Sequence, residues 1–127
     1  MAVHDMQIKV DGEAVNTRLY NPEFAQDNIV LFCHGFPGSN RLVKLHEPLK
    51  DAGICLAEIN FRGDPQSGGK FSFLGSIEDI LQTRDRLRLE YKDTKLSALG
   101  YSYGGFCASN ILAANPGRFD EVFLLNP

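Results

Sequence analysis

Ser102 lies in the short stretch Gly100-Tyr-Ser-Tyr-Gly104, where its hydroxyl could act as a nucleophile. A serine hydroxyl is a weak nucleophile until a neighbouring base accepts its proton. The G-x-S-x-G spacing is typical of a sharp turn between a strand and a helix, because glycines two residues before and after the serine prevent steric collisions. The alternative interpretation is a glycine-rich turn with an incidental serine, so the surrounding elements must discriminate between the two.

The elements expected around Ser102 are those of an α/β protein. Continuous apolar runs predict buried strands, apolar residues at helical spacing predict helices, and Asp11-Gly12 predicts a hairpin turn. We expect a hairpin at 7–10 and 17–20, further strands at 29–33, 54–59, 96–99 and 122–125, and helices at 42–49, 76–91 and 103–114. This order predicts a mostly parallel sheet with crossover helices and an antiparallel N-terminal hairpin, about six strands and three helices in all.

A loop that could complete the site follows the first buried strand, with the sequence Cys-His-Gly-Phe-Pro-Gly-Ser-Asn at residues 33–40. Attack by a serine on an acyl group creates an oxyanion, which two converging N–H donors stabilise. Tyr103, the residue after the serine, would supply one N–H group, and Phe36 would supply the other. On its own, this loop would be interpreted as an ordinary turn rich in glycine and proline.

Three motifs together resemble the α/β-hydrolase superfamily, and the resemblance covers nearly the whole chain. They are the His-Gly loop at residues 34–38, the sequence Asn-Phe-Arg-Gly-Asp-Pro-Gln-Ser-Gly-Gly at residues 60–69, and the stretch at residues 100–104. The resemblance implies an incomplete α/β-hydrolase fold with Ser102 as the nucleophile of a nucleophile elbow. It also implies an oxyanion hole formed by Phe36 and Tyr103. The residues that would support the elbow and the oxyanion loop are His34, Gly35, Gly100 and Gly104.

The same resemblance implies a class of reaction. An elbow serine in this family most often serves a carboxylesterase, thioesterase, lipase or peptidase-like acyl hydrolase, which acts through a covalent acyl-enzyme. No organic cofactor and no metal is implied. The aromatic residues Phe36, Tyr101 and Tyr103 suggest a small apolar ester-like substrate, although aromatic residues at such a turn are equally typical of a core.

The sequence departs from the family after Ser102. The family's serine is followed along the chain by an acid and then by a histidine. Here only Asp120 and Glu121 are acidic beyond the serine, and no histidine follows it. His34 is expected to pack within its loop, and His4 and His46 to lie at a surface or an interface.

The length also predicts that part of the domain is missing. The chain has 127 residues, and single domains of this kind commonly have about 200 to 250. We expect residues 1–127 to form the N-terminal half of an α/β-hydrolase domain, without the segment that carries the triad acid and histidine. A complementary C-terminal half could come from a second chain, or the chain could be a truncated fragment. It could instead be a non-catalytic scaffold or binding module that forms a homo-oligomer through the sheet edge at residues 122–125.

The composition excludes several other classes. A net charge of −3 gives no general attraction to nucleic acid, and no apolar run approaches the roughly 20 residues of a membrane span. The first ten residues do not form a secretory signal, and Cys33, Cys55 and Cys107 suit reduced buried thiols, so a cytoplasmic location is expected. Arg62 is expected to pair with a carboxylate that fixes its loop or to meet an acidic substrate.

Overall fold

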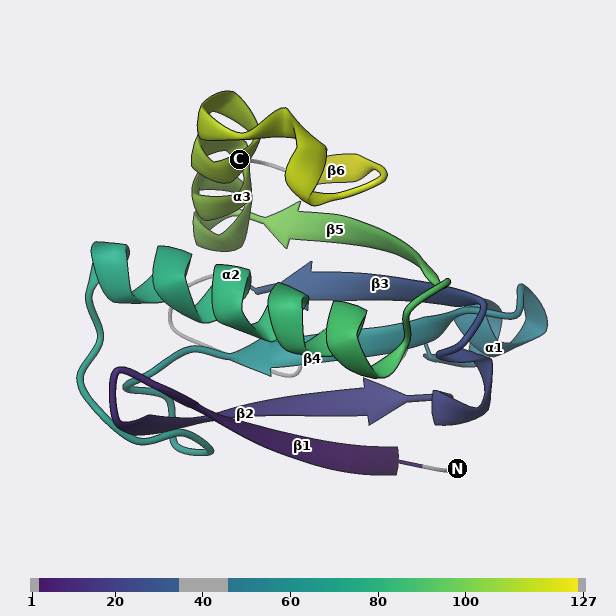
Figure 1. The fold of residues 1–127 in the computed structure, drawn as a ribbon, viewed down its shortest axis with the longest axis horizontal. Helices are drawn as coiled ribbons and strands as arrows, with labels where there is room; N and C mark the ends of the chain where they lie inside the picture. Colours follow the sequence, from purple (N-terminus) through teal and green to yellow (C-terminus); the bar gives the residue numbers. More distant parts are fainter. Residues whose placement is uncertain (1–2, 35–45, 126–127) are drawn as a thin grey trace.

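The computed structural model describes residues 3–34 and 46–125, without the side chain of His46. These residues form a sheet with helices on both faces (Figure 1). The strands are β1 (Val3–Val10), β2 (Glu13–Tyr20), β3 (Asn28–Cys33), β4 (Cys55–Asn60), β5 (Lys95–Tyr101) and β6 (Val122–Leu125). The helices are α1 (His46–Asp51), α2 (Phe73–Glu90) and α3 (Tyr103–Ala114), with short 3-10 turns at Pro22–Phe24 and Pro116–Arg118.

The sheet is mostly parallel, as the sequence predicts, and its antiparallel part lies at the N-terminus. The strand order is β1-β2-β4-β3-β5-β6; β1 pairs with β2 and β2 with β4 in antiparallel directions, and the other pairs are parallel. Asp11 and Gly12 both have positive φ, 53° and 81°, which matches the twist that a two-residue hairpin needs. The parallel strands β3, β4 and β5 therefore end at one common edge of the sheet (Figure 1).

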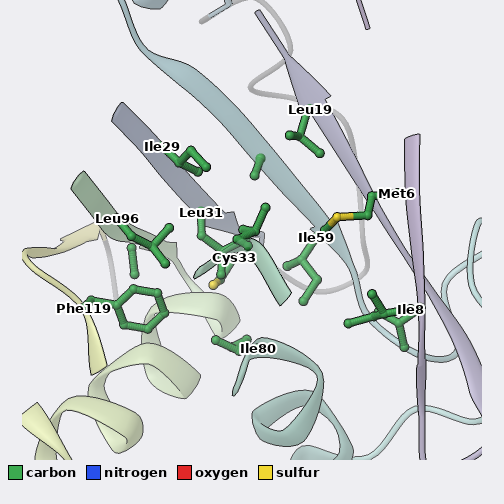
Figure 2. Packing of buried hydrophobic residues seen from close by; sticks show 14 of the residues in the cluster. Met6, Ile8, Leu19, Ile29, Leu31, Cys33, Ile59, Ile80, Leu96 and Phe119 are labelled. Carbon is green, nitrogen blue, oxygen red and sulfur yellow. The ribbon is translucent and has the colours of Figure 1, made fainter. Parts of the chain in front are cut away.

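The larger core lies between the sheet and the helices α2 and α3. Figure 2 shows Leu31 and Cys33 of β3 and Ile59 of β4 on the side of the sheet that faces Ile80 of α2. All four side chains are fully buried. Burying an aliphatic side chain of this size contributes about 1.5 to 3 kcal/mol relative to leaving it exposed. This core fixes α2 and α3 against the strands whose ends carry the candidate site.

The opposite face of the sheet has a smaller cluster. Phe32 and Leu56 alternate with the residues of the larger core and pack with Tyr20 on this second face, where Leu49 of α1 contacts them. Leu99 of β5 belongs to the same cluster but is only partly buried. The β5 side of this face is therefore less covered than the β4 side.

One helix boundary differs from the sequence expectation, and another cannot be compared with it. Helix α2 begins at Phe73 rather than at Ser76, because the side chain of Ser72 accepts a hydrogen bond from the N–H of Gly75 at 2.9 Å and caps the helix. Ser76 is buried inside the helix, where its hydroxyl donates to the carbonyl of Ser72. For the helix expected at 42–49, the structure describes only the part from His46 onward; residues 42–45 lie outside the described residues.

Candidate active site

Ser102 lies at the turn between β5 and α3, at the edge where the parallel strands end. It is exposed, and its backbone has φ 55° and ψ −116°, a conformation that residues with a side chain seldom adopt. Its N–H donates to the carbonyl of Leu125 at 2.9 Å, and its own carbonyl accepts from Phe106 at 3.0 Å. The chain thus changes from strand to helix at this one strained residue.

Two glycines make this turn possible in the space available. A Cβ atom at Gly104 would overlap the carbonyl group of Cys33 and come within 2.6 Å of the carbonyl oxygen of His34. A Cβ atom at Gly100 would lie 2.6 Å from the Cα of Gly105. Because the neighbouring atoms are backbone in both cases, a larger residue would force α3 away from β3 at Gly104 and away from β5 at Gly100. The G-x-S-x-G spacing therefore has a steric explanation here.

His34 is buried directly after β3, with its ring held on two sides. Its Nε2 atom lies 2.8 Å from Oδ2 of Asp64, and the two side chains are only 5% and 12% exposed. The ring also makes an edge contact with Phe61, with ring centroids 5.0 Å apart. Phe61 in turn contacts the ring of Tyr103, with centroids 6.0 Å apart. His34 is thus connected to the residue that follows Ser102.

Tyr103 is fixed at the start of α3 by its own ring. Its hydroxyl donates to Oγ of Ser76 in α2 at 2.9 Å, and Phe71 lies with its ring centroid 5.3 Å away. Burial raises the pKa of Tyr103 to about 12, so its hydroxyl remains a hydrogen-bond donor well into the alkaline range. Tyr103 therefore joins α3 to α2 beside Ser102.

Arg62 pairs with a carboxylate, which confirms the first of its two expected roles. Its guanidinium donates to Oδ1 of Asp79 at 3.0 and 2.8 Å, and its backbone N–H donates to Oδ2 at 2.8 Å. Asp79 is fully buried in α2. The hydrogen bonds that Arg62 donates to Asp79 raise the pKa of the Arg62 guanidinium, and the pair ties the loop after β4 to α2.

Glu58 is a second buried carboxylate near the site, and among the described residues it has no ion pair like that of Asp79 with Arg62. It lies in β4, is 2% exposed and neighbours His34. Burial raises the pKa of Glu58, and a positive charge on His34, when its ring is protonated, acts in the opposite direction with a smaller effect. Among the residues that the structure describes, no group of three or more His, Cys, Asp or Glu side chains is arranged to hold a metal ion.

The structure gathers most of the residues singled out from the sequence. His34, Gly100, Ser102, Tyr103 and Gly104 lie together where β3 and β5 end. Gly35 and Phe36, assigned to the oxyanion loop and the oxyanion hole, lie outside the described residues. Sequence reasoning missed Asp64 and Phe61 as neighbours of His34. Both belong to the loop motif at 60–69, but its spacing does not identify a partner for a histidine 30 residues earlier.

The mostly parallel sheet and the strained serine between a strand and a helix place the chain among α/β proteins. The chain belongs to the α/β hydrolase fold family, whose sequence pattern matches residues 28–127. Mouse monoglyceride lipase is 25% identical over 125 residues, covering 94% of this chain but 41% of the lipase. The rat enzyme is 23% identical with the same coverage.

Solved structures agree on the fold. A carboxyl esterase from Bacillus coagulans has a TM-score of 0.80 and 22% identity, covering 98% of this chain and 44% of the esterase chain. Est1E from Butyrivibrio proteoclasticus has a TM-score of 0.81 and 22% identity, covering 92% and 50% respectively. The chain therefore spans less than half the length of the monoglyceride lipases and corresponds to a partial domain of this fold.

Proposed function

We propose that Ser102 is the nucleophile of a serine acyl hydrolase that cleaves esters, thioesters or amides through a covalent acyl-enzyme. The observation that carries this proposal is the strained, exposed position of Ser102 between β5 and α3. Backbone strain of this kind costs about 1 to 3 kcal/mol, and it concentrates at functional sites. A purely structural turn has no need of it.

The N–H group of Tyr103 is proposed as one donor of the oxyanion hole. Tyr103 is the first residue of α3, so its N–H points toward the N-terminal end of the helix, where negative charge is favoured. The second donor is proposed to be Phe36, and Gly35 to shape its loop; both residues lie outside the described part of the chain. His34, Gly100 and Gly104 would support this arrangement by the contacts described above.

The base and the acid of the triad are proposed to come from a complementary C-terminal half, on a second chain or in a further segment. No histidine follows Ser102 in this sequence, and His34 is engaged with Asp64. Without its base a triad serine loses most of its catalytic gain. The chain on its own is therefore expected to be inactive.

A small apolar ester-like substrate is the substrate class proposed. The relatives named above include lipases and esterases. Phe71 and Phe106 are 41% and 52% exposed; Phe71 contacts the ring of Tyr103, and Phe106 is hydrogen-bonded to Ser102 through the backbone. These side chains offer apolar surface near the serine.

We also propose a cytoplasmic location, because all three cysteines are buried free thiols. Among the described helices, none has the length and apolar character of a membrane span.

A specific observation favours a second candidate, a binding module that self-associates. Three consecutive residues of the edge strand β6 are exposed: Phe123 at 48%, Leu124 at 36% and Leu125 at 49%. An exposed apolar edge strand is a template for pairing with another chain. This candidate keeps the scaffold and makes Ser102 a structural residue only.

Labelling with a fluorophosphonate separates the two candidates. The chain is treated alone and after mixing with polypeptides that copurify with it from its source cells, and the modified residue is identified by mass spectrometry. The matched variants are Ser102→Ala and Ser109→Ala, since Ser109 lies on α3 and donates to the carbonyl of Phe106. We expect labelling that needs a second polypeptide and is lost only in Ser102→Ala. Absence of labelling in every mixture contradicts the hydrolase proposal and leaves the binding module.

A further inference from the structure

The end of β3 is in direct backbone contact with the first turn of α3. The carbonyl groups of Cys33 and His34 occupy the space that a side chain at Gly104 would need. Any displacement of the His34 backbone therefore moves atoms against which Gly104 is packed. His34 also reaches the same turn through its ring, by way of Phe61 and Tyr103.

The ring of His34 makes a polar contact with a residue outside its own strand, and this contact contributes to its orientation. Its Nε2 atom and Oδ2 of Asp64 are 2.8 Å apart, and both side chains are almost completely shielded from solvent. A hydrogen bond at one ring nitrogen fixes both the tautomer and the angle of an imidazole. The acceptor is a carboxylate, so the proton belongs on Nε2.

Asp64 is itself well anchored, because its loop is bonded to β2 and β4. The N–H of Asp64 donates to the carbonyl of Phe61 at 2.9 Å, and its carbonyl accepts from Ser67 at 3.0 Å. The hydroxyl of Ser67 donates to the carbonyl of Asn60 at 2.6 Å and accepts from the N–H of Asn16 at 3.0 Å. The carboxylate of Asp64 is thus a fixed point relative to the sheet.

From these contacts we propose that Asp64 is a positioning residue for the candidate nucleophile turn, acting through the ring of His34 on Tyr103 and Ser102. The proposal rests on the proposed function for its consequence in catalysis, and on the contacts alone for its structural part. Asp64 fixes His34, His34 fixes Phe61 and the backbone beside Gly104, and these fix the N–H of Tyr103 relative to Ser102.

Three variants test the proposal. Asp64→Ala removes the acceptor, Asp64→Asn keeps an oxygen that can accept the same hydrogen bond, and Asp93→Ala removes an exposed aspartate from a distant loop as the matched control. Two readouts do not depend on activity. The ¹⁵N chemical shift of His34 reports which ring nitrogen carries the proton, and amide exchange compares Phe106, which donates to Ser102, with Asn115, which donates to Ile111 at the far end of α3.

We expect a proton on Nε2 of His34 in the wild type, in Asp64→Asn and in Asp93→Ala, and loss of that preference in Asp64→Ala. Exchange at Phe106 should accelerate in Asp64→Ala while exchange at Asn115 stays unchanged. In whichever mixture labels Ser102, Asp64→Ala should slow labelling about 10-fold or more and Asp64→Asn should restore most of the rate, because small displacements of reacting groups are costly.

An unprotonated Nε2 in the wild type overturns the proposal, and so does exchange at Phe106 that is the same in Asp64→Ala and Asp93→Ala. A labelling rate that Asp64→Ala leaves unchanged overturns its catalytic part. A wild type that labels under no condition refutes the proposed hydrolase instead, and the two NMR readouts then still decide the role of Asp64. If Asp64→Ala does not fold, Asp64→Leu, which keeps a similar side-chain volume but offers no acceptor to Nε2 of His34, takes its place in both readouts.

Discussion

The ends of β3, β4 and β5 differ from the outer strand β6 in how completely the chain covers them. Cys33, His34 and Phe61 are at most 4% exposed, and the backbone of β3 touches that of α3 at Gly104. In β6, by contrast, Phe123 and Leu125 stay about half exposed. The described residues therefore make close contacts around the turn at Ser102 and leave the side chains of the neighbouring strand β6 largely exposed.

The two regions are nevertheless connected. The N–H of Ser102 donates to the carbonyl of Leu125, and β6 pairs with β5 over residues 98–101. The serine therefore stands on the boundary between a closely packed region and an open one. Variants on each side of this boundary test whether the packed region alone determines the turn.

The largest effect is expected for Gly104→Ala, which tests the close contact itself. Its Cβ atom would overlap the carbonyl of Cys33, and backbone cannot move aside as a flexible side chain can. We expect a loss of about 4 kcal/mol in the free energy of unfolding, the upper end of single-residue effects, measured by urea denaturation. Gly117→Ala is the control, because its nearest neighbour would be 3.8 Å away. Equal stability of the two variants would contradict the close packing described here.

The next largest effect is expected for Asp79→Ala, which removes the fully buried carboxylate of the Arg62 pair and leaves Arg62 with the exposed Asp11 at 3.4 Å. Removing one partner of a buried ion pair costs about 3 kcal/mol or more. The control is Asp5→Ala, which removes the partner of Arg18 in a pair whose side chains are 39% and 46% exposed, where about 1 kcal/mol or less is expected. A similar loss in both variants, measured by urea denaturation, would show that burial of the Arg62 pair does not matter.

The same contrast explains how much the sequence could predict. The strands of the parallel sheet and the hairpin turn are specified by local sequence patterns. Residues 29–33 form a continuous apolar run, and Asp11-Gly12 is a turn signal; both predictions are confirmed. The family, the partial domain and the pairing of Arg62 with a carboxylate are likewise confirmed. The proposed roles of Ser102 and its neighbours stay predictions.

What the sequence could not predict are contacts between distant residues. The start of α2 was placed at Ser76, because a serine followed by Asp79 resembles a helix start; the structure shows Ser76 buried against Tyr103 and Asp79 engaged with Arg62. Both side chains have tertiary partners that override the local pattern. The pair of His34 and Asp64 is likewise invisible to periodicity, because it depends on how β3 and β4 lie side by side.

A smaller effect is expected for Glu58→Gln, which should change how the free energy of unfolding depends on pH. Burial raises the pKa of Glu58, so the folded state holds its proton to higher pH than the unfolded chain. Its stabilising contribution is therefore complete below the unfolded value of about 4.3 and is lost as pH rises through the folded pKa. Glu58→Gln should gain stability over the wild type as pH rises from 4 to 7, by about 1.4 kcal/mol for each unit of the shift.

The measurement is urea denaturation at several pH values, with Glu23→Gln as the control because Glu23 is exposed. The difference between Glu58→Gln and the wild type should level off above the folded pKa of Glu58. A difference that is constant from pH 4 to 7 would mean that burial does not perturb this carboxyl group.

The smallest effect on folding and the clearest effect on association are expected for the double variant Phe123→Lys, Leu125→Lys. Both side chains already face solvent, so the free energy of unfolding should change by less than about 1 kcal/mol, and the backbone pairing of β6 with β5 should persist. Charged lysines on an edge strand oppose pairing with another chain. Light scattering should show the wild type gaining mass with concentration and the variant remaining smaller.

The control is Leu89→Lys, which places the same charge on an exposed leucine of α2, away from β6. If Leu89→Lys lowers the mass as much as the double variant does, general charge rather than the β6 edge governs association. If the double variant remains small and Ser102 still labels in the presence of a second polypeptide, the backbone bond from Ser102 to Leu125 is enough to hold the serine. The side chains of β6 then serve self-association and are not required by the second polypeptide.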